Sequence, residues 1–172
     1  VAAVGYASSI LFFSTSIGIG LSIAASALVS PAIGANLRAR ARRLSAHAHV
    51  LAFAISAVFS VVLWLLIPNL LTLLGATGRT HALAAHYLNI LIPTLPFLAM
   101  GMASTAVLRS VGDARRAMYV TMGAAIVNVL LDMLLILKLG WGIEGAAIAS
   151  AVARMAVTAI GLYGVIWVHD LM

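Results

Sequence analysis

The chain of 172 residues is 64% hydrophobic and only 8% charged, with a mean hydropathy of +1.16. Soluble domains carry roughly 25% charged residues, so this composition excludes one and predicts an all-α integral membrane protein. A net charge of +6 suits nucleic-acid binding only on a soluble basic face, and the absence of cysteine excludes disulfides and thiolate chemistry.

Apolar runs and the breaks between them predict five transmembrane helices in a single membrane domain. A helix that crosses the hydrocarbon core needs about 20 predominantly apolar residues, and each run reaches that length. The predicted spans cover residues 6–33, 46–67, 82–107, 117–137 and 143–168. Because the chain begins with Val1 and its first residues already resemble a span, we expect a fragment that lacks an upstream helix.

Basic residues of the connecting loops alternate between the two sides of the membrane. The second and fourth loops hold one basic residue each, Arg79 and Lys138, whereas the first and third loops together hold seven basic residues. These seven are Arg38, Arg40, Arg42, Arg43, Arg109, Arg115 and Arg116. Short cytoplasmic loops carry the excess of Lys and Arg, so we expect these two loops and the chain end inside. We expect them to contact anionic membrane lipids and not nucleic acid.

Prolines and one aspartate mark the expected irregularities of the helices. Pro93 and Pro96 lie inside the third span, where each lacks a backbone donor, so they predict a bend that is either a hinge or a fixed kink. Pro68, shortly after Trp64, predicts the end of the second helix. Asp113 in the third loop is predicted to cap the helix that follows or to temper the neighbouring arginines.

Asp132 is the only carboxylate in the long apolar run 118–139, and Asn128 precedes it by one helical turn. A charge at membrane depth costs at least about 3 kcal/mol, so such residues usually mark an ion path, a proton relay or a buried pair. At a rise of about 1.5 Å per residue, Asp132 and Ser150 lie at matching depths in the last two helices. Asn128 and Arg154 match each other one turn deeper, near the midplane.

Two roles are open for Asp132. It is either a coupling residue, which exchanges a proton or a cation as the substrate moves, or one half of a static ion pair with Arg154. Asn128 either orients the carboxyl group or a bound ion, or bonds only to a neighbouring helix. Arg154 is expected to lock helices together, and a direct contact with substrate is the less favoured alternative.

Neither a metal site nor an enzyme is predicted. His47 and His49 are expected at the inner interface and His81 and His86 at the outer one, so no ion could bind both pairs. His81 and His86 are five residues apart, so they do not lie on the same face of a helix, as two metal ligands at the spacing i, i+4 would. No Ser-His-Asp arrangement, phosphate loop or carboxylate pair is present, so we expect no catalytic residue and no cofactor beyond a coupling ion.

Three sequence motifs resemble those of the multidrug and toxic compound extrusion (MATE) transporters. The motifs are LRSVGDAR at 108–115, Asn128-x-x-x-Asp132, and GWGIEGAAIAS at 140–150. The resemblance covers nearly the whole chain, from the second to the sixth helix of the family. It implies a twelve-helix, two-lobe fold, of which residues 1–172 form a partial amino-terminal lobe without its first helix.

The resemblance also implies a function in the plasma membrane. Family members are antiporters that export cationic, amphipathic small molecules in exchange for H⁺ or Na⁺, and the missing first helix and second lobe would complete the protein. The implied ion or proton site includes Asn128, Asp132 and Ser150, which stands where some members carry a threonine. Two features depart from the pattern: the acidic residue of the first helix is absent, and Ser30 with Pro31 replaces a frequent glutamine.

Two other functions remain open from the sequence. Related exporters with twelve to fourteen helices move lipid-linked oligosaccharides, but such a flippase should carry several basic residues at membrane depth, where only Arg154 lies here. That difference favours drug export. A membrane scaffold without transport, in which Asp132 only locks helices, is the third interpretation.

Overall fold

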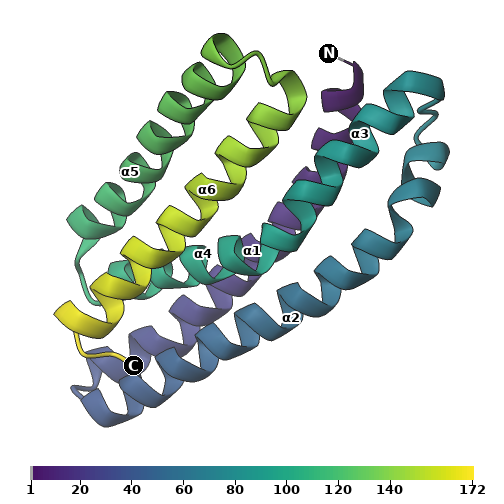
Figure 1. The fold of residues 1–172 in the computed structure, drawn as a ribbon. Coiled ribbons are helices and arrows are strands. Elements are labelled where there is room, and N and C mark those ends of the chain that lie inside the picture. Colours follow the sequence, from purple (N-terminus) through teal and green to yellow (C-terminus); the bar gives the residue numbers. More distant parts are fainter. Residues whose placement is uncertain (1) are drawn as a thin grey trace.

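The computed structural model describes residues 2–172, which contain five helical segments long and apolar enough to cross a membrane. The described residues contain no strand, so the prediction of an all-α membrane bundle is confirmed. Figure 1 shows the bundle. Its helices are α1 (Ala2–Gly34), α2 (Arg38–Leu73), α3 (Gly78–Leu91), α4 (Leu95–Ser110), α5 (Ala114–Asp132) and α6 (Gly142–Tyr163), and π-helical turns follow α5 (Met133–Lys138) and α6 (Gly164–Val168).

Helix α4 lies at the centre of the bundle. It packs against α1 and α2 on one side and against α5 and α6 on the other, and its span is the most buried of the five. In Figure 1 the α1–α2 hairpin and the α5–α6 hairpin flank it. Because lipid supplies no hydrophobic drive between helices, close packing of small residues must hold α4 in place.

Helix α2 is longer at both ends than the sequence predicts. Its first turn begins at Arg38, so the four arginines at 38–43 are helical and the connection to α1 is only residues 35–37. Arginine is a good helix former, which explains this extension. Pro68 does not end the helix, which continues to Leu73, because a transmembrane helix tolerates the loss of one backbone donor. Both loop boundaries were therefore wrong.

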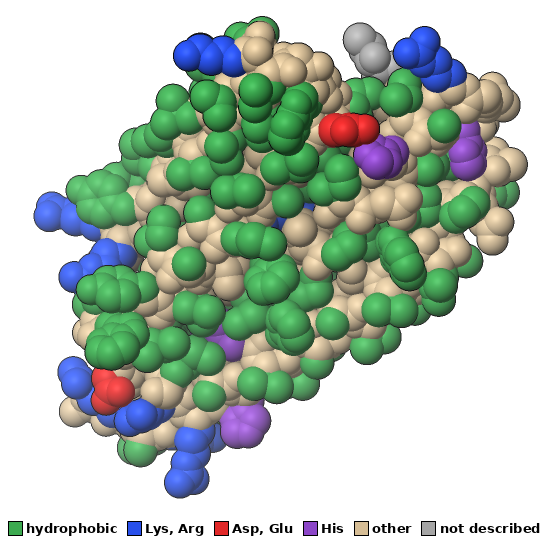
Figure 2. Space-filling view, viewed as in Figure 1, with side chains coloured by type: hydrophobic (Ala, Val, Ile, Leu, Met, Phe, Trp, Pro, Cys, Tyr) green, Lys and Arg blue, Asp and Glu red, His purple; other side chains and the backbone are tan. Residues whose placement is uncertain are grey.

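Basic side chains nevertheless gather at one end of the molecule. The α1–α2 connection, the α4–α5 connection and the chain end lie together at the lower left of Figure 1. Figure 2 shows most of the Lys and Arg side chains at this end, a smaller group at the opposite end, and a mostly hydrophobic surface between them. This distribution fits the expected cytoplasmic placement of the basic end, which stays a prediction.

The expected bend in the third span is present between α3 and α4. Residues Ile92–Thr94 form a 3-10 turn, in which the amide of Leu95 donates to the carbonyl of Ile92 and not to that of Leu91, as an α-helix would require. Pro93 has no amide hydrogen with which to continue the α-helical pattern. The bend changes the direction of the chain, as Figure 1 shows, and leaves the Leu91 carbonyl available to another donor.

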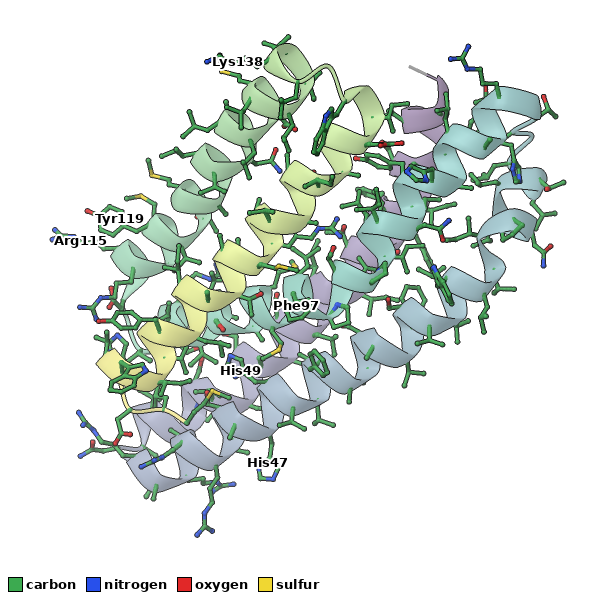
Figure 3. The ribbon with its side chains drawn as sticks, viewed as in Figure 1. His47, His49, Phe97, Arg115, Tyr119 and Lys138 are labelled. Carbon is green, nitrogen blue, oxygen red and sulfur yellow. The ribbon has the colours of Figure 1, made fainter. Side chains whose placement is uncertain are left out.

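His49 is fully buried, which corrects its expected position at the membrane interface. Its Nδ1 lies 2.8 Å from the carbonyl oxygen of Ser45 and its Nε2 lies 2.9 Å from Ser104 Oγ on α4. His47 points out of the bundle, as Figure 3 shows, because two residues along a helix turn a side chain to the opposite face. His49 therefore fixes α2 to α4.

Asp113 caps α5, as the sequence predicts. Its Oδ1 accepts a hydrogen bond from the amide of Arg116 at 3.1 Å, and its Oδ2 accepts one from His169 Nε2 at 2.9 Å. The Arg116 guanidinium is also 3.1 Å from Oδ2. These contacts connect the start of α5 to the segment that follows α6.

We expect the replacement of Asp113 by Asn to reduce the acid sensitivity of the fold. The hydrogen bond from His169, followed by that from the Arg116 amide, lowers the pKa of Asp113 below its ordinary value of about 4. A pKa that is lower in the folded state gives stability that is complete above this ordinary value and is lost as the pH falls through the folded pKa. Melting temperatures of the full-length protein in detergent, between about pH 6 and pH 3, test this.

Asp170 provides the matched control for this titration. It is an exposed acid at the same end of the molecule, 3.4 Å from Arg42, and exposed ion pairs contribute little to stability. The Asp170→Asn variant should therefore keep the acid sensitivity of the wild type. Equal acid sensitivity of the Asp113→Asn variant and the wild type would show that this cap does not titrate in the expected range.

Candidate membrane-embedded polar site

The α5–α6 hairpin brings Asn128 and Ser150 together. The side-chain amide of Asn128 donates to Ser150 Oγ at 3.4 Å, and both residues are half-buried. The depth calculation had paired Ser150 with Asp132 instead, which lies one turn nearer to the end of α5. That calculation assumed α-helical geometry up to Lys138, whereas residues Met133–Lys138 form a π-helical turn, which advances less per residue. Asn128, one turn deeper than Asp132, is the residue that meets Ser150.

Asp132 lies where the helix type changes. It is the last residue of α5, and the π-helical turn begins at the next residue. Its side chain is half-buried, and its Oδ1 is sealed from the surface without a hydrogen-bond partner in the described chain. Single π turns are frequent at functional sites, and a buried carboxylate oxygen without a donor is costly unless something binds it. Both features favour a ligand at this carboxyl group.

Arg154 does not form the expected ion pair with Asp132. Among residues 2–172, the ion pairs join Asp113 to Arg116 and His169, Arg42 to Asp170, and His86 to Glu144. The Nη1 of Arg154 donates instead to the Leu91 carbonyl at 3.0 Å and to Thr94 Oγ1 at 2.9 Å. The reason is the bend between α3 and α4, which frees that carbonyl. Arg154 thus locks α6 to the bend, but through neutral acceptors.

Two further residues of this site were missed in the sequence analysis. Tyr87 is half-buried on α3, which packs against α6, and its hydroxyl group lies near Ser150. Thr94 donates its hydroxyl to the Leu91 carbonyl at 2.7 Å while it accepts from Arg154. A tyrosine within the apolar run 82–107 and a threonine next to Pro93 were the available signals. The site therefore draws on α3, α5 and α6.

The arrangement provides oxygen atoms and one cation at membrane depth. Asp132, Asn128 and Ser150 can offer carboxylate, amide and hydroxyl oxygens, which are the ligands that hard cations prefer. Coupling to H⁺ would require only the carboxyl group of Asp132, which would bind the proton without further ligands. The structure joins Asn128 to Ser150 across two neighbouring helices, with Asp132 one turn further along α5 and Arg154 bonded to the bend between α3 and α4.

Comparisons with known proteins place the chain in a family. The MatE family model matches residues 1–134. A probable multidrug resistance protein of Bacillus subtilis, YoeA, is 28% identical over 91% of this chain and 35% of its own length. A FAD transporter of Shewanella oneidensis is 29% identical over 99% of this chain and 39% of its own length.

Solved structures of MATE proteins have the same fold. A MATE protein crystallised in the bent conformation superposes with a TM-score of 0.92 at 25% identity, over 98% of this chain and 38% of that one. An inward-facing multidrug resistance MATE transporter gives a TM-score of 0.89 at 26% identity, over 94% and 37%. The chain spans somewhat more than a third of the length of these relatives. It belongs to the MatE family of MATE transporters, which are multi-pass membrane proteins.

Proposed function

We propose that the full-length protein is a secondary active exporter of amphipathic, cationic small molecules, driven by exchange for H⁺ or Na⁺. Membership of the MatE family and the likeness to a probable multidrug resistance protein support this proposal. On the same grounds we expect the protein to be a transporter without enzymatic activity. The rest of the chain, including a further helix and a second lobe, would form the translocation pathway together with residues 1–172.

The observation that carries the proposal is the buried Oδ1 of Asp132, which has no partner among residues 2–172. In a low-dielectric site an unpaired carboxylate either takes up a proton or binds a cation. Asn128 and Ser150 on the facing helices could complete the coordination of Na⁺, whereas H⁺ would require Asp132 alone. In either case binding neutralises the charge.

Coupling follows from this neutralisation. While Asp132 is ionised, it can attract the positive group of a substrate from the inner side of the membrane. When it binds H⁺ or Na⁺ from the outer side, that attraction ends and the substrate is released. A ligand shifts a conformational equilibrium only by its differential affinity for the two states, so the coupling ion and the substrate must favour opposite-facing states.

The likeness to a FAD transporter widens the range of candidate substrates. FAD carries phosphate groups, and Arg154 is a cation at membrane depth that forms no ion pair with the described residues. Substrates that carry an anionic group next to a cationic or aromatic part are therefore compatible with the proposed export. A lipid-linked oligosaccharide would need more basic residues at this depth than the chain has.

Export by everted membrane vesicles tests the proposal. A proton gradient and a sodium gradient are imposed separately on vesicles that contain the full-length protein. One of the two gradients should drive uptake of a cationic dye such as ethidium into the vesicles. The gradient that supports uptake identifies the coupling ion, and an ionophore that collapses it should release the dye. If neither gradient moves dye into vesicles that contain folded protein, the proposed function is wrong.

A further inference from the structure

Among residues 2–172, Arg154 is the only Lys or Arg that lies far from both ends of its membrane span. It stands 12 residues after Gly142 and 14 residues before Val168, the two ends of that span. At about 1.5 Å per residue this places its Cα about 18 Å from one end and about 21 Å from the other. The guanidinium therefore lies near the middle of the bilayer, where a charge without compensation is costly.

The guanidinium uses only one of its three nitrogens for contacts within the described chain. Its Nη1 donates to the Leu91 carbonyl and to Thr94 Oγ1, both of which are neutral. Its Nε and Nη2 donate to none of residues 2–172. They are also not sealed inside, because the buried polar atoms without a partner are Ser45 Oγ and Asp132 Oδ1. The Nε–Nη2 edge of this half-buried side chain therefore has no hydrogen-bond partner among residues 2–172.

The contacts of Nη1 fix the direction of this free edge. Thr94 donates its hydroxyl to the Leu91 carbonyl, so its oxygen is available to accept from Arg154, and both acceptors belong to the bend between α3 and α4. The planar guanidinium cannot turn without breaking both bonds. A donor pair held in this way has already lost the side-chain entropy that binding would otherwise cost.

An oxyanion matches this edge in geometry and in charge. The Nε–Nη2 fork donates two parallel hydrogen bonds to a carboxylate or phosphate group, and charge-assisted bonds of this kind are about twice as strong as neutral ones. Ser150 lies one turn before Arg154 on the same face of α6, so its hydroxyl group could donate to the same group. Asp132 does not occupy the fork, although it lies on the adjacent helix.

We propose that the Nε–Nη2 edge of Arg154 binds a carboxylate or phosphate group of the transported substrate. This proposal rests on the proposed export function and narrows its substrate class. Asp132 and Arg154 carry opposite charges, lie in one site and do not pair with each other, so the complementary ligand is a zwitterionic amphiphile with a cationic and an anionic group. Arg154 is then a specificity-determining residue, in addition to its contact with the bend.

A matched pair of substrates tests this role. One compound is an aromatic amine with a free carboxylate, and the other is its methyl ester, which has the same scaffold and cationic group but no anion. Uptake of both is measured in proteoliposomes with the full-length protein. The wild type should prefer the acid, and Arg154→Gln should lower the ratio of kcat/KM for acid over ester by about tenfold or more. Arg109→Gln removes an arginine at the end of α4 and should leave this ratio unchanged.

A second variant covers the possibility that Arg154→Gln does not fold. Arg154→Lys keeps a positive charge that can reach the bend but lacks the two-pronged fork, so it should also lower the ratio of acid to ester. If the two variants slow acid and ester to the same extent, Arg154 serves only as a helix lock or as the partner of an acid elsewhere in the chain, and the proposal is wrong. If the wild type takes up ethidium but does not prefer the acid to the ester, the export function stands and the role of Arg154 is wrong, whereas failure to take up ethidium as well refutes the export function itself.

Discussion

Replacing Asp132 by Asn in the full-length protein is expected to lower gradient-driven dye export by roughly a hundredfold. This factor is near the upper end of the effects that typical coupling free energies produce. The amide has the size of the carboxyl group, but it neither takes up a proton at physiological pH nor attracts a cation as a carboxylate does. Export should fall while the amount of folded protein in the membrane stays the same. Dye uptake by everted vesicles, normalised to the folded protein in them, measures the effect.

The structure explains why this variant should fold. Asp132 forms no ion pair within residues 2–172, and its Oδ1 has no hydrogen bond to lose. A buried ion pair would behave differently, because removing one partner leaves an unpaired charge and typically costs about 3–5 kcal/mol. A folded but inactive variant would therefore separate the coupling role from the scaffold interpretation, in which Asp132 only holds helices together.

Glu144 provides the control for this experiment. It is the other acid of the α5–α6 hairpin, and its carboxylate lies 3.1 Å from His86 at the rim of the bundle. Both side chains are more than half exposed, so Glu144→Gln should retain export. Export by the Asp132→Asn variant with an unchanged dependence on the ion gradient would show that the coupling assignment is wrong.

The bundle itself could be predicted from the sequence, because the signals that define it are local. A run of about 20 apolar residues can cross a bilayer only as a helix, which gives all five spans. Pro93 bends its span because it lacks an amide hydrogen, and Asp113 caps α5 because its side chain meets the free amide of Arg116. The ends of α2 were missed because arginine and a single proline are both compatible with a continuing helix.

The partners of the buried polar groups could not be predicted, because they depend on backbone geometry that composition does not reveal. The chain after Asp132 forms a π-helical turn instead of the straight α-helix that the depth calculation assumes, and Asn128 and not Asp132 meets Ser150. The bend at Pro93 exposes a carbonyl that then captures Arg154. Depth along a straight helix places these residues in the correct region of the membrane, but one turn of error is enough to exchange their partners.

The replacement of Gly161 by Ala is expected to destabilise the bundle, although alanine is the better helix former. A Cβ at this position would lie 2.8 Å from the Cβ of Ser104 on α4, which is closer than such atoms approach in real structures. Overpacking of this kind typically costs about 1–3 kcal/mol. Helix α4 would have to move away from α6, and the hydrogen bond between Ser104 and His49 on α2 would be strained as well.

Gly20 is the matched control, and it should respond in the opposite direction. It also lies within a transmembrane helix, but a Cβ there would have no neighbour within 4 Å. Gly20→Ala should therefore keep the helix-propensity gain of about 1 kcal/mol and raise the melting temperature of the full-length protein in detergent, whereas Gly161→Ala should lower it. Shifts of the same sign in both variants would contradict the close α4–α6 approach, because intrinsic helix propensity would then outweigh the contact between Gly161 and Ser104.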